Sequence, residues 1–452
     1  MEIVVINGSP AGENSITLQT VEYLKALFPQ HTYTTLHVGR QIRSIERDFS
    51  QARAALEGAE LILFCYPVYT FLVPSQMHRF LELVKEHHVD LAGTYASQIS
   101  TSKHFYDTTA HRFVQDFCAD LKLRYVRGLS ADMEDLLTEE GQTEAKEYFR
   151  YLLWNIRRGL SEPPSCRSSA PLPGVPARDV KETTLSQKLH VALVADYDPE
   201  DPDALLPGMI RRFKKRLPGS MELINLREYP FKGGCLGCFH CALDGTCIYK
   251  DGFDEFLRKH VNHADAVVYA FTIKDHSMGS RFKLYDDRQF CNGHRTVTMG
   301  KPVGYLVDGD PDAEENLRTL MEARAEVGGN FLAGIASNRN NPDAEIDQLV
   351  RRLVYAVRNH YTEPKNFYGV GGLKIFRDLI FEMQGLMKED HRFYKEHGFY
   401  DFPQKKRGKI AAMYLVSALM NNQKLKERGG VDFTEGMLKP YRAVIKKAMR
   451  RG

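Results

Sequence analysis

The sequence predicts two doubly wound parallel-sheet α/β domains in tandem, followed by a helical C-terminal extension. Three observations support this fold class. The chain has 452 residues, which exceeds one typical hydrophobic core. Short apolar strand-like runs alternate with amphipathic helical patterns, as in parallel sheets covered by helices. The same pattern then restarts after a proline-rich break. With 43% hydrophobic and 26% charged residues, the composition is that of an ordinary globular protein.

The first third of the chain gives the elements of the first domain in order. Residues 2–8 (EIVVING) form a short apolar run that ends in a turn, and residues 15–29 have helical spacing of their apolar side chains. Residues 59–69 (AELILFCYPVY) are nearly continuously apolar, as expected of a strand buried on both faces. A second helix is predicted over residues 74–86 and a further strand over residues 96–102.

An interruption follows, and then a second copy of the pattern. Residues 159–188 contain five prolines and little periodicity, which predicts a linker. After it, LHVALVADYDPEDPDALL matches the pattern of MEIVVINGSPAGENSITL, and HADAVVYAFTIKDHSMGS matches that of GAELILFCYPVYTFLVPS. We interpret this as an internal duplication with a register of about 190–200 residues. The predicted division is 1–158, the linker 159–188, 189–365 and a helical extension 366–452.

Charge is distributed unevenly along the chain. The net charge is only +3, so no overall field favours nucleic acid. Residues 405–452, however, hold thirteen Lys and Arg against three acidic residues. One interpretation is the solvated face of terminal helices, and the other is a surface for an anionic partner or membrane.

The start of the chain gives an expectation about the redox environment. Met1 leads directly into a strand pattern without a signal-like segment, and no apolar run reaches the ~18 residues of a membrane span. We therefore expect a cytoplasmic protein with reduced thiols, in which a structural disulfide is disfavoured.

The loop after the first strand, NGSPAGENSIT, lies where doubly wound folds bind phosphate, at a helix N-terminus. It has neither the G-x-G-x-x-G pattern of dinucleotide sites nor the G-x4-G-K-[ST] pattern of triphosphate loops. Ser9, Asn14, Ser15 and Thr17 offer side-chain donors, although Ser9 and Asn14 would also serve as helix caps. Residues 66–76 and 100–111 follow later strands and supply aromatic groups, whose alternative role is packing.

Two of these segments, together with a cysteine-rich segment of the second copy, resemble parts of a known family. INGSPAGENSIT and YPVYTFLVPSQMHRFLELV resemble the phosphate loop and the P-V-Y segment of flavodoxin-like NAD(P)H-dependent FMN reductases. KGGCLGCFHCALDGTCIYKDGFDEF resembles the cysteine segment of the iron–sulfur flavoprotein branch. The resemblance implies two flavodoxin-like domains, FMN as cofactor and NAD(P)H as electron donor. The residues that it implies for FMN are Ser9, Asn14, Ser15, Thr17, Pro67, Val68, Tyr69, Thr70, Phe71, Ser102, His104 and Tyr106.

The two copies depart from the family in complementary ways. The first copy has the FMN loop but no cysteine in the matching segment LHVGRQIRSIERDF. The second has the cysteines, but its first loop carries Asp196, Asp198, Glu200, Asp201 and Asp203, which would repel a phosphate. We predict one FMN per chain, in the first copy. We also hypothesise that the duplication is a fused dimer, in which the cysteine segment of the second copy lies near the flavin of the first.

The cysteine segment itself leaves alternatives open. Cys235, Cys238, Cys241 and Cys247 follow the spacing C-x2-C-x2-C-x5-C, which allows three thiolates to converge on one iron–sulfur cluster. The spacing and the resemblance favour a [4Fe–4S] cluster. Unligated or reversibly oxidised thiols are the second interpretation and zinc is the third. His240 is expected to be a neighbour of such a site and not a ligand.

The expected function is an FMN-dependent NAD(P)H oxidoreductase that passes electrons to a cluster or to a small acceptor such as a quinone or flavin. The sequence indicates no catalytic acid or base, because a bound flavin needs chiefly positioning and tuning. The expected partners are then a nicotinamide donor and an electron acceptor. We expect no nucleic-acid partner and no membrane span, and a homo-oligomer is compatible with the pattern. The alternative is an electron carrier, or a flavin-binding scaffold whose basic tail docks a partner.

Overall fold

The computed structural model describes residues 1–162, 174–181, 189–201 and 204–420. They divide into two compact units, Met1–Phe393 and Tyr394–Gly452. The first unit contains both predicted α/β copies, and each copy is built around its own parallel sheet. The fold class predicted from the sequence is therefore confirmed.

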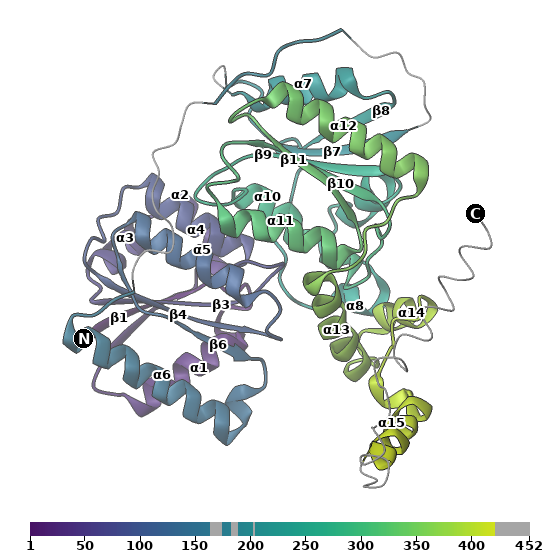
Figure 1. Ribbon diagram of the computed structural model, residues 1–452. Helices are drawn as coiled ribbons and strands as arrows, with labels where there is room; N and C mark the ends of the chain where they lie inside the picture. Colours follow the sequence, from purple (N-terminus) through teal and green to yellow (C-terminus); the bar gives the residue numbers. More distant parts are fainter. Residues whose placement is uncertain (163–173, 182–188, 202–203, 421–452) are drawn as a thin grey trace. The chain divides into compact units, whose positions relative to one another are not determined.

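The sheet of the first copy has the strand order β2-β1-β3-β4-β5, with β6 also pairing with β4. Its strands are β1 (Glu2–Asn7), β2 (Thr32–Leu36), β3 (Leu61–Pro67), β4 (Tyr95–Ser102), β5 (Arg124–Tyr125) and β6 (Leu129–Asp132). Its helices are α1 (Ile16–Leu27), α2 (Val38–Arg47), α3 (Ser50–Glu57), α4 (Ser75–Glu86), α5 (Asp107–Asp120) and α6 (Glu139–Arg158). Figure 1 shows α1 and α6 on one face of this sheet and α3, α4 and α5 on the other.

The second sheet repeats this order as β8-β7-β9-β10-β11. Its strands are β7 (His190–Asp196), β8 (Ser220–Asn225), β9 (Ala266–Thr272), β10 (Pro302–Asp308) and β11 (Phe331–Ser337). The helices of this copy are α7 (Leu206–Arg216), α8 (His240–Asp244), α9 (Phe253–Phe256), α10 (Ser280–Arg288), α11 (Glu315–Gly328) and α12 (Pro342–Asn359). In both sheets every strand pair is parallel, so all carboxyl ends of one sheet lie at one edge.

The two copies share a hydrophobic core. One continuous cluster of buried apolar residues contains Met77 and Phe80 of α4 together with Phe282 and Tyr285 of α10. Two further clusters lie on the outer faces, one within each copy. Burial of apolar surface is the main favourable term in folding, so the copies stabilise each other as the halves of an obligate interface would.

The segment after the second copy begins as an added layer of the first unit. In α13 (Phe367–Glu382), Gly372 packs against Val327 and Phe105, and the Phe376 ring lies 4.4 Å from that of Phe105. Helix α14 (Lys388–Glu396) follows, and α15 (Arg407–Met420) belongs to the second unit. The predicted helical extension beyond residue 420 lies outside the described residues.

The predicted linker is only partly described. Residues 163–173 and 182–188 of it lie outside the described part of the chain. In the described stretch, the Val175 N–H donates to the Asn338 carbonyl at 2.6 Å, and Arg178 pairs with Asp343. These residues therefore pack on the second copy. The boundaries 1–158, 189–365 and 366–452 remain predictions.

Candidate functional site

The loop from Gly8 to Thr17 connects β1 to α1 at the carboxyl edge of the first sheet. Ser15 is the N-cap of α1, and its hydroxyl accepts the Leu18 N–H at 3.3 Å. The Ser9 hydroxyl accepts the Ala11 N–H at 3.3 Å, and Asn14 is exposed at the end of a short 3-10 turn. Ser15 therefore caps α1, whereas the sequence had suggested Ser9 and Asn14 as possible caps.

The buried hydroxyls of this loop suit an anion. Ser9 and Ser15 are each only 3% exposed and use a lone pair in the bonds above, so each retains its O–H donor. The first N–H groups of α1 have no partner within the helix and carry the positive end of its dipole. Thr17 differs, because its hydroxyl bonds Thr101 of β4 at 2.5 Å and so ties the helix to the sheet. The loop therefore fits the phosphate of a flavin mononucleotide.

A basic residue that sequence reasoning missed lies against this loop. Arg40 of α2 packs over Gly12, where an added Cβ would lie 2.9 Å from Arg40 Cδ. Its side chain is exposed and, among the described residues, has no carboxylate partner. Helix α2 can approach the loop closely because Gly39 has no side chain. A Cβ at this position would lie 2.4 Å from the Gly8 carbonyl oxygen. The pattern Gly39-Arg40 in the first turn of α2, shortly after β2, was the available signal.

The loop after β3 has a strained turn. Thr70 and Phe71 both have positive φ, 42° and 70°, which is uncommon for residues other than glycine. Tyr69 and Leu72 close this turn with two backbone hydrogen bonds of 2.8 and 3.0 Å. Strain of this kind is concentrated at functional sites. The second copy repeats the turn at Asp275 and His276, with φ of 49° and 61°, although its sequence differs.

The predicted ring-facing residues are brought to the same sheet edge, but not all of them line an open slot. Pro67 ends β3 and the Val68 N–H donates to Thr101 of β4 at 3.0 Å. Phe71 is 5% exposed and its ring centroid lies 4.5 Å from that of Tyr106. Phe105 and Tyr368 extend this aromatic cluster.

Residues after β4 complete the edge. Ser102 is buried and its hydroxyl accepts the His104 N–H at 2.8 Å, while the exposed His104 ring lies 3.0 Å from Asp107. The Tyr106 hydroxyl is buried and has no hydrogen-bond partner among the described residues. Burial raises the pKa of Tyr106, so the phenol stays a proton donor. A buried unpaired donor is costly, and a carbonyl or ring nitrogen of a bound flavin would satisfy it.

The cysteine segment of the second copy contacts this edge of the first. The Gln76 amide donates to the Cys235 carbonyl at 3.1 Å. Gly237, with φ of 62°, lies so near the Tyr69 hydroxyl that an added Cβ would be 1.8 Å from it. Burial, and then the neighbouring Cys235 thiol, raises the pKa of Tyr69. Arg43 of α2 also donates to the Lys232 carbonyl. The segment is therefore a neighbour of the predicted flavin-facing loop.

Arg288 anchors the segment from α10. Its guanidinium forms two hydrogen bonds of 2.9 and 2.8 Å with Asp251 and donates to the Gly233 carbonyl at 2.9 Å. It also stacks on the Tyr249 ring, 4.6 Å from the centroid. Since the Arg288 side chain is 1% exposed, these charge-assisted bonds form in a low-dielectric interior.

The thiols are not arranged around one point. Among the described residues, no three His, Cys, Asp or Glu side chains form a group that could hold a metal ion. The Cys241 thiol instead donates to the Phe290 carbonyl at 3.0 Å, and burial raises its pKa to about 11. Burial also raises the pKa of Cys235. In this arrangement the Cys241 thiol is engaged by a backbone carbonyl, and we derive no step through a cluster.

The corresponding loop of the second copy is closed by ion pairs. Arg227, which follows β8 as Arg40 follows β2, lies 2.9 Å from Asp198 and 3.6 Å from Asp196. Burial raises the pKa of Asp196. Glu200 and Asp201 continue the acidic loop, and Asp203 lies outside the described residues. The carboxylates therefore occupy the guanidinium that an anion would need.

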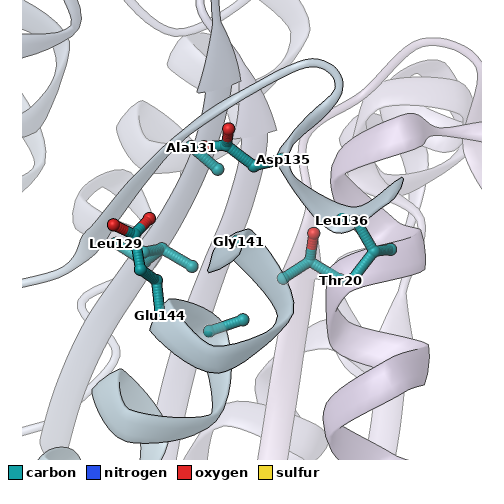
Figure 2. Close-up of a pocket in the computed structure, with 8 residues that line it drawn as sticks. Thr20, Leu129, Ala131, Asp135, Leu136, Gly141 and Glu144 are labelled. Atoms are coloured by element: carbon teal, nitrogen blue, oxygen red, sulfur yellow. The ribbon is translucent and has the colours of Figure 1, made fainter. Parts of the chain in front are cut away.

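Two pockets in the described part of the chain are lined by none of the residues predicted for FMN. The pocket in Figure 2 has a volume of about 10 Å³ between α1, β6 and the start of α6, which is room for about one water molecule. A second, of about 300 Å³, lies in the second copy between α7 and β8 and includes Tyr197 and Leu223. The site is thus defined by its loops and contacts.

A family comparison agrees with the fold of the first copy, and several known proteins are similar to this chain. Residues 1–112 match the model of a family described by its flavodoxin-like fold. An iron–sulfur flavoprotein of Archaeoglobus fulgidus is 28% identical over 174 residues, which cover 36% of this chain and 79% of that protein. An FMN-dependent NADH-azoreductase from Bacillus anthracis, solved with FMN, is 11% identical with a TM-score of 0.28, covering 33% of this chain and 98% of its own. An apo NADH:FMN oxidoreductase is 20% identical with a TM-score of 0.30, covering 36% of this chain and 92% of its own.

Proposed function

We propose that this chain, whose first copy matches the flavodoxin-like family, is an FMN-dependent oxidoreductase with one flavin per chain. The observation that carries the proposal is the junction at Tyr69. There the predicted flavin-facing loop of one copy contacts the cysteine segment of the other. The names of the similar iron–sulfur flavoprotein and FMN-dependent reductases support the same cofactor.

Each group of the site has a proposed role. Ser9, Ser15 and Arg40 bind the phosphate, through two hydroxyl donors and one guanidinium. Thr17 holds α1 against β4 and so fixes the loop. Tyr69 and Tyr106 bind and orient the ring, and Phe71 excludes water from beneath it. When bound, FMN supplies hydride acceptance and onward electron transfer, while the protein supplies orientation.

We further propose that NAD(P)H is the donor and that a quinone, a flavin or a similar small oxidant is the acceptor. The [4Fe–4S] cluster at Cys235, Cys238, Cys241 and Cys247 remains a prediction of the sequence. Anaerobic purification with an absorbance spectrum and an iron determination tests both redox groups together. Flavin bands with about four iron atoms per chain support the cluster, whereas flavin bands without iron leave thiols as the state of the segment.

The first test concerns stoichiometry. The protein should bind one FMN per chain, and Ser9→Asp should abolish all binding because it places a carboxylate at the phosphate. Asp198→Ser, in the corresponding loop of the second copy, should leave binding unchanged. Two flavins per chain, or half of the flavin retained by Ser9→Asp, would contradict a single site in the first copy.

The second test separates an enzyme from an electron carrier or scaffold. NADH or NADPH added anaerobically to the flavin-loaded protein should bleach its yellow colour without any partner protein, and a quinone should restore it. A protein that binds flavin but is not bleached by either nucleotide would be a carrier or scaffold.

A further inference from the structure

The second compact unit contains a helix whose described side chains are exposed. In α15, every described side chain from Arg407 to Leu415 is exposed. Four of these are large and apolar, with exposed fractions of 43% for Ile410, 55% for Met413, 76% for Tyr414 and 64% for Leu415. Soluble proteins rarely leave such a contiguous apolar group in water unless it binds something.

Positive charge adjoins this apolar group. Lys405, Lys406, Arg407 and Lys409 immediately precede it, and only Lys406 has a carboxylate partner among the described residues, Asp401 at 2.8 Å. Lys405 lies over the rings of Tyr400 and Phe402, 6.0 and 5.2 Å from their centroids. Over residues 405–452 the sequence has thirteen basic and three acidic residues.

The length and pattern of α15 limit what it can bind. A helix of 14 residues is about 21 Å long and does not cross a hydrocarbon core of about 30 Å. No helix in the described part of the chain is long and apolar enough to span a membrane. The apolar residues of α15 also lie on consecutive positions, 410 to 416, and do not form the narrow stripe of a helix pair.

We propose that α15 and its basic flank bind the surface of an anionic lipid bilayer, with the helix lying in the interface. An apolar helix flanked by Lys and Arg enters the headgroup region by burying its side chains while its cations meet lipid phosphates. Tyr414 has the apolar ring and polar tip that suit this depth. A second copy of this chain is disfavoured as the occupant, because pairing would bring two strongly positive segments together.

The test uses full-length protein and vesicles of two compositions, phosphatidylcholine alone and phosphatidylcholine with 30% phosphatidylglycerol. Cosedimentation should show at least tenfold tighter binding to the anionic vesicles, and the difference should shrink in high salt. Met413→Asp with Leu415→Asp should lower the anionic binding at least tenfold, as should Arg407→Glu with Lys409→Glu. Leu137→Asp, at an apolar side chain of the first copy that is 82% exposed, is the matched control and should bind as the wild type does.

Three results would overturn the proposal. The first is equal binding to both vesicles, and the second is anionic binding that both double variants leave unchanged. The third is a concentration-dependent dimer, detected by sedimentation without vesicles, that Met413→Asp with Leu415→Asp dissociates, since the apolar group would then be a contact between copies. Thermal unfolding of each variant confirms that the first unit is intact.

Discussion

The backbone N–H of Ser280 donates to the Glu82 carboxylate at 2.7 Å, and the backbone N–H of Ser75 donates to Asp287 at 2.8 Å. Ser75 and Ser280 are the first residues of α4 and α10, and each acceptor lies seven residues into the opposite helix. Each helix therefore caps the N-terminus of the other. Such reciprocity is the mark of an isologous, two-fold interface, and here it occurs between two copies within one chain. It supports the fused-dimer hypothesis.

This relationship predicts a large stability effect at Glu82. The side chain is 4% exposed and accepts both the backbone N–H and the hydroxyl of Ser280, so its removal leaves these donors of α10 without their acceptor. Glu82→Ala should lower the free energy of unfolding by about 3 kcal/mol, measured by urea denaturation. Glu86→Ala, one turn later and 43% exposed, is the control and should cost less than about 1 kcal/mol. Equal losses would contradict the capping role.

The second prediction concerns pH and the turn of the second copy. His276 hydrogen-bonds Asp120 at 3.1 Å and Glu314 at 2.9 Å, and these two carboxylates raise its pKa to about 10. Lys85 and Asp275, which pair at 2.8 Å, adjoin the same cluster. Because the folded pKa exceeds the unfolded value of about 6.5, the stabilisation is complete below pH 6.5 and is lost as pH rises through 10.

Urea denaturation at several pH values tests this link. His276→Gln should be less stable than the wild type at pH 6, and the difference should shrink steadily between pH 7 and pH 10. His263→Gln, at an exposed histidine of the same copy, is the control and should show no such trend. A constant difference across this range would mean that His276 acts through packing and not through its charge.

The third prediction concerns Arg40, which depends on the proposed flavin site. Arg40→Gln should weaken FMN binding at least tenfold, because a charge-assisted contact to phosphate contributes about 1.5–3 kcal/mol. Flavin fluorescence quenching on titration of the apoprotein measures it. Arg47→Gln, at the end of the same helix, is the control. Riboflavin lacks the phosphate and should bind the wild type and Arg40→Gln equally, whereas an equal loss for both ligands would place Arg40 elsewhere.

The fourth prediction separates binding from stability at Tyr106. Tyr106→Phe keeps the ring within the Phe71 cluster and removes a buried hydroxyl that has no partner. The apoprotein should therefore be as stable as the wild type or more so, while FMN binding should weaken by roughly 1 kcal/mol. Thermal unfolding and flavin titration give the two readouts. A destabilised apoprotein with unchanged flavin affinity would assign the hydroxyl a purely structural role.

Much of the architecture follows from local patterns. The near-continuous apolar run of β3 predicts a strand buried on both faces, and the restart of the pattern after the prolines predicts the second sheet. The position of Ser9, Ser15, Thr17 and Pro67–Phe71 at one sheet edge also follows, because loops after parallel strands share that edge. The sequence spacing did not show which residue caps α1 or that Thr17 hydrogen-bonds Thr101, because both depend on distances in the folded chain.

The sequence by itself determined the two folds, the edge at which the loops meet and the separation of the predicted phosphate loop and the cysteines into different copies. Only the tertiary structure decided how the copies join, that Gly237 lies against Tyr69, and that Arg227 is neutralised by Asp196 and Asp198 while Arg40 is not. The physical reason is that periodicity and turn chemistry are local, acting over a few residues. Contacts between residues 159 to 212 positions apart depend on how two complete surfaces pack, which no local pattern records.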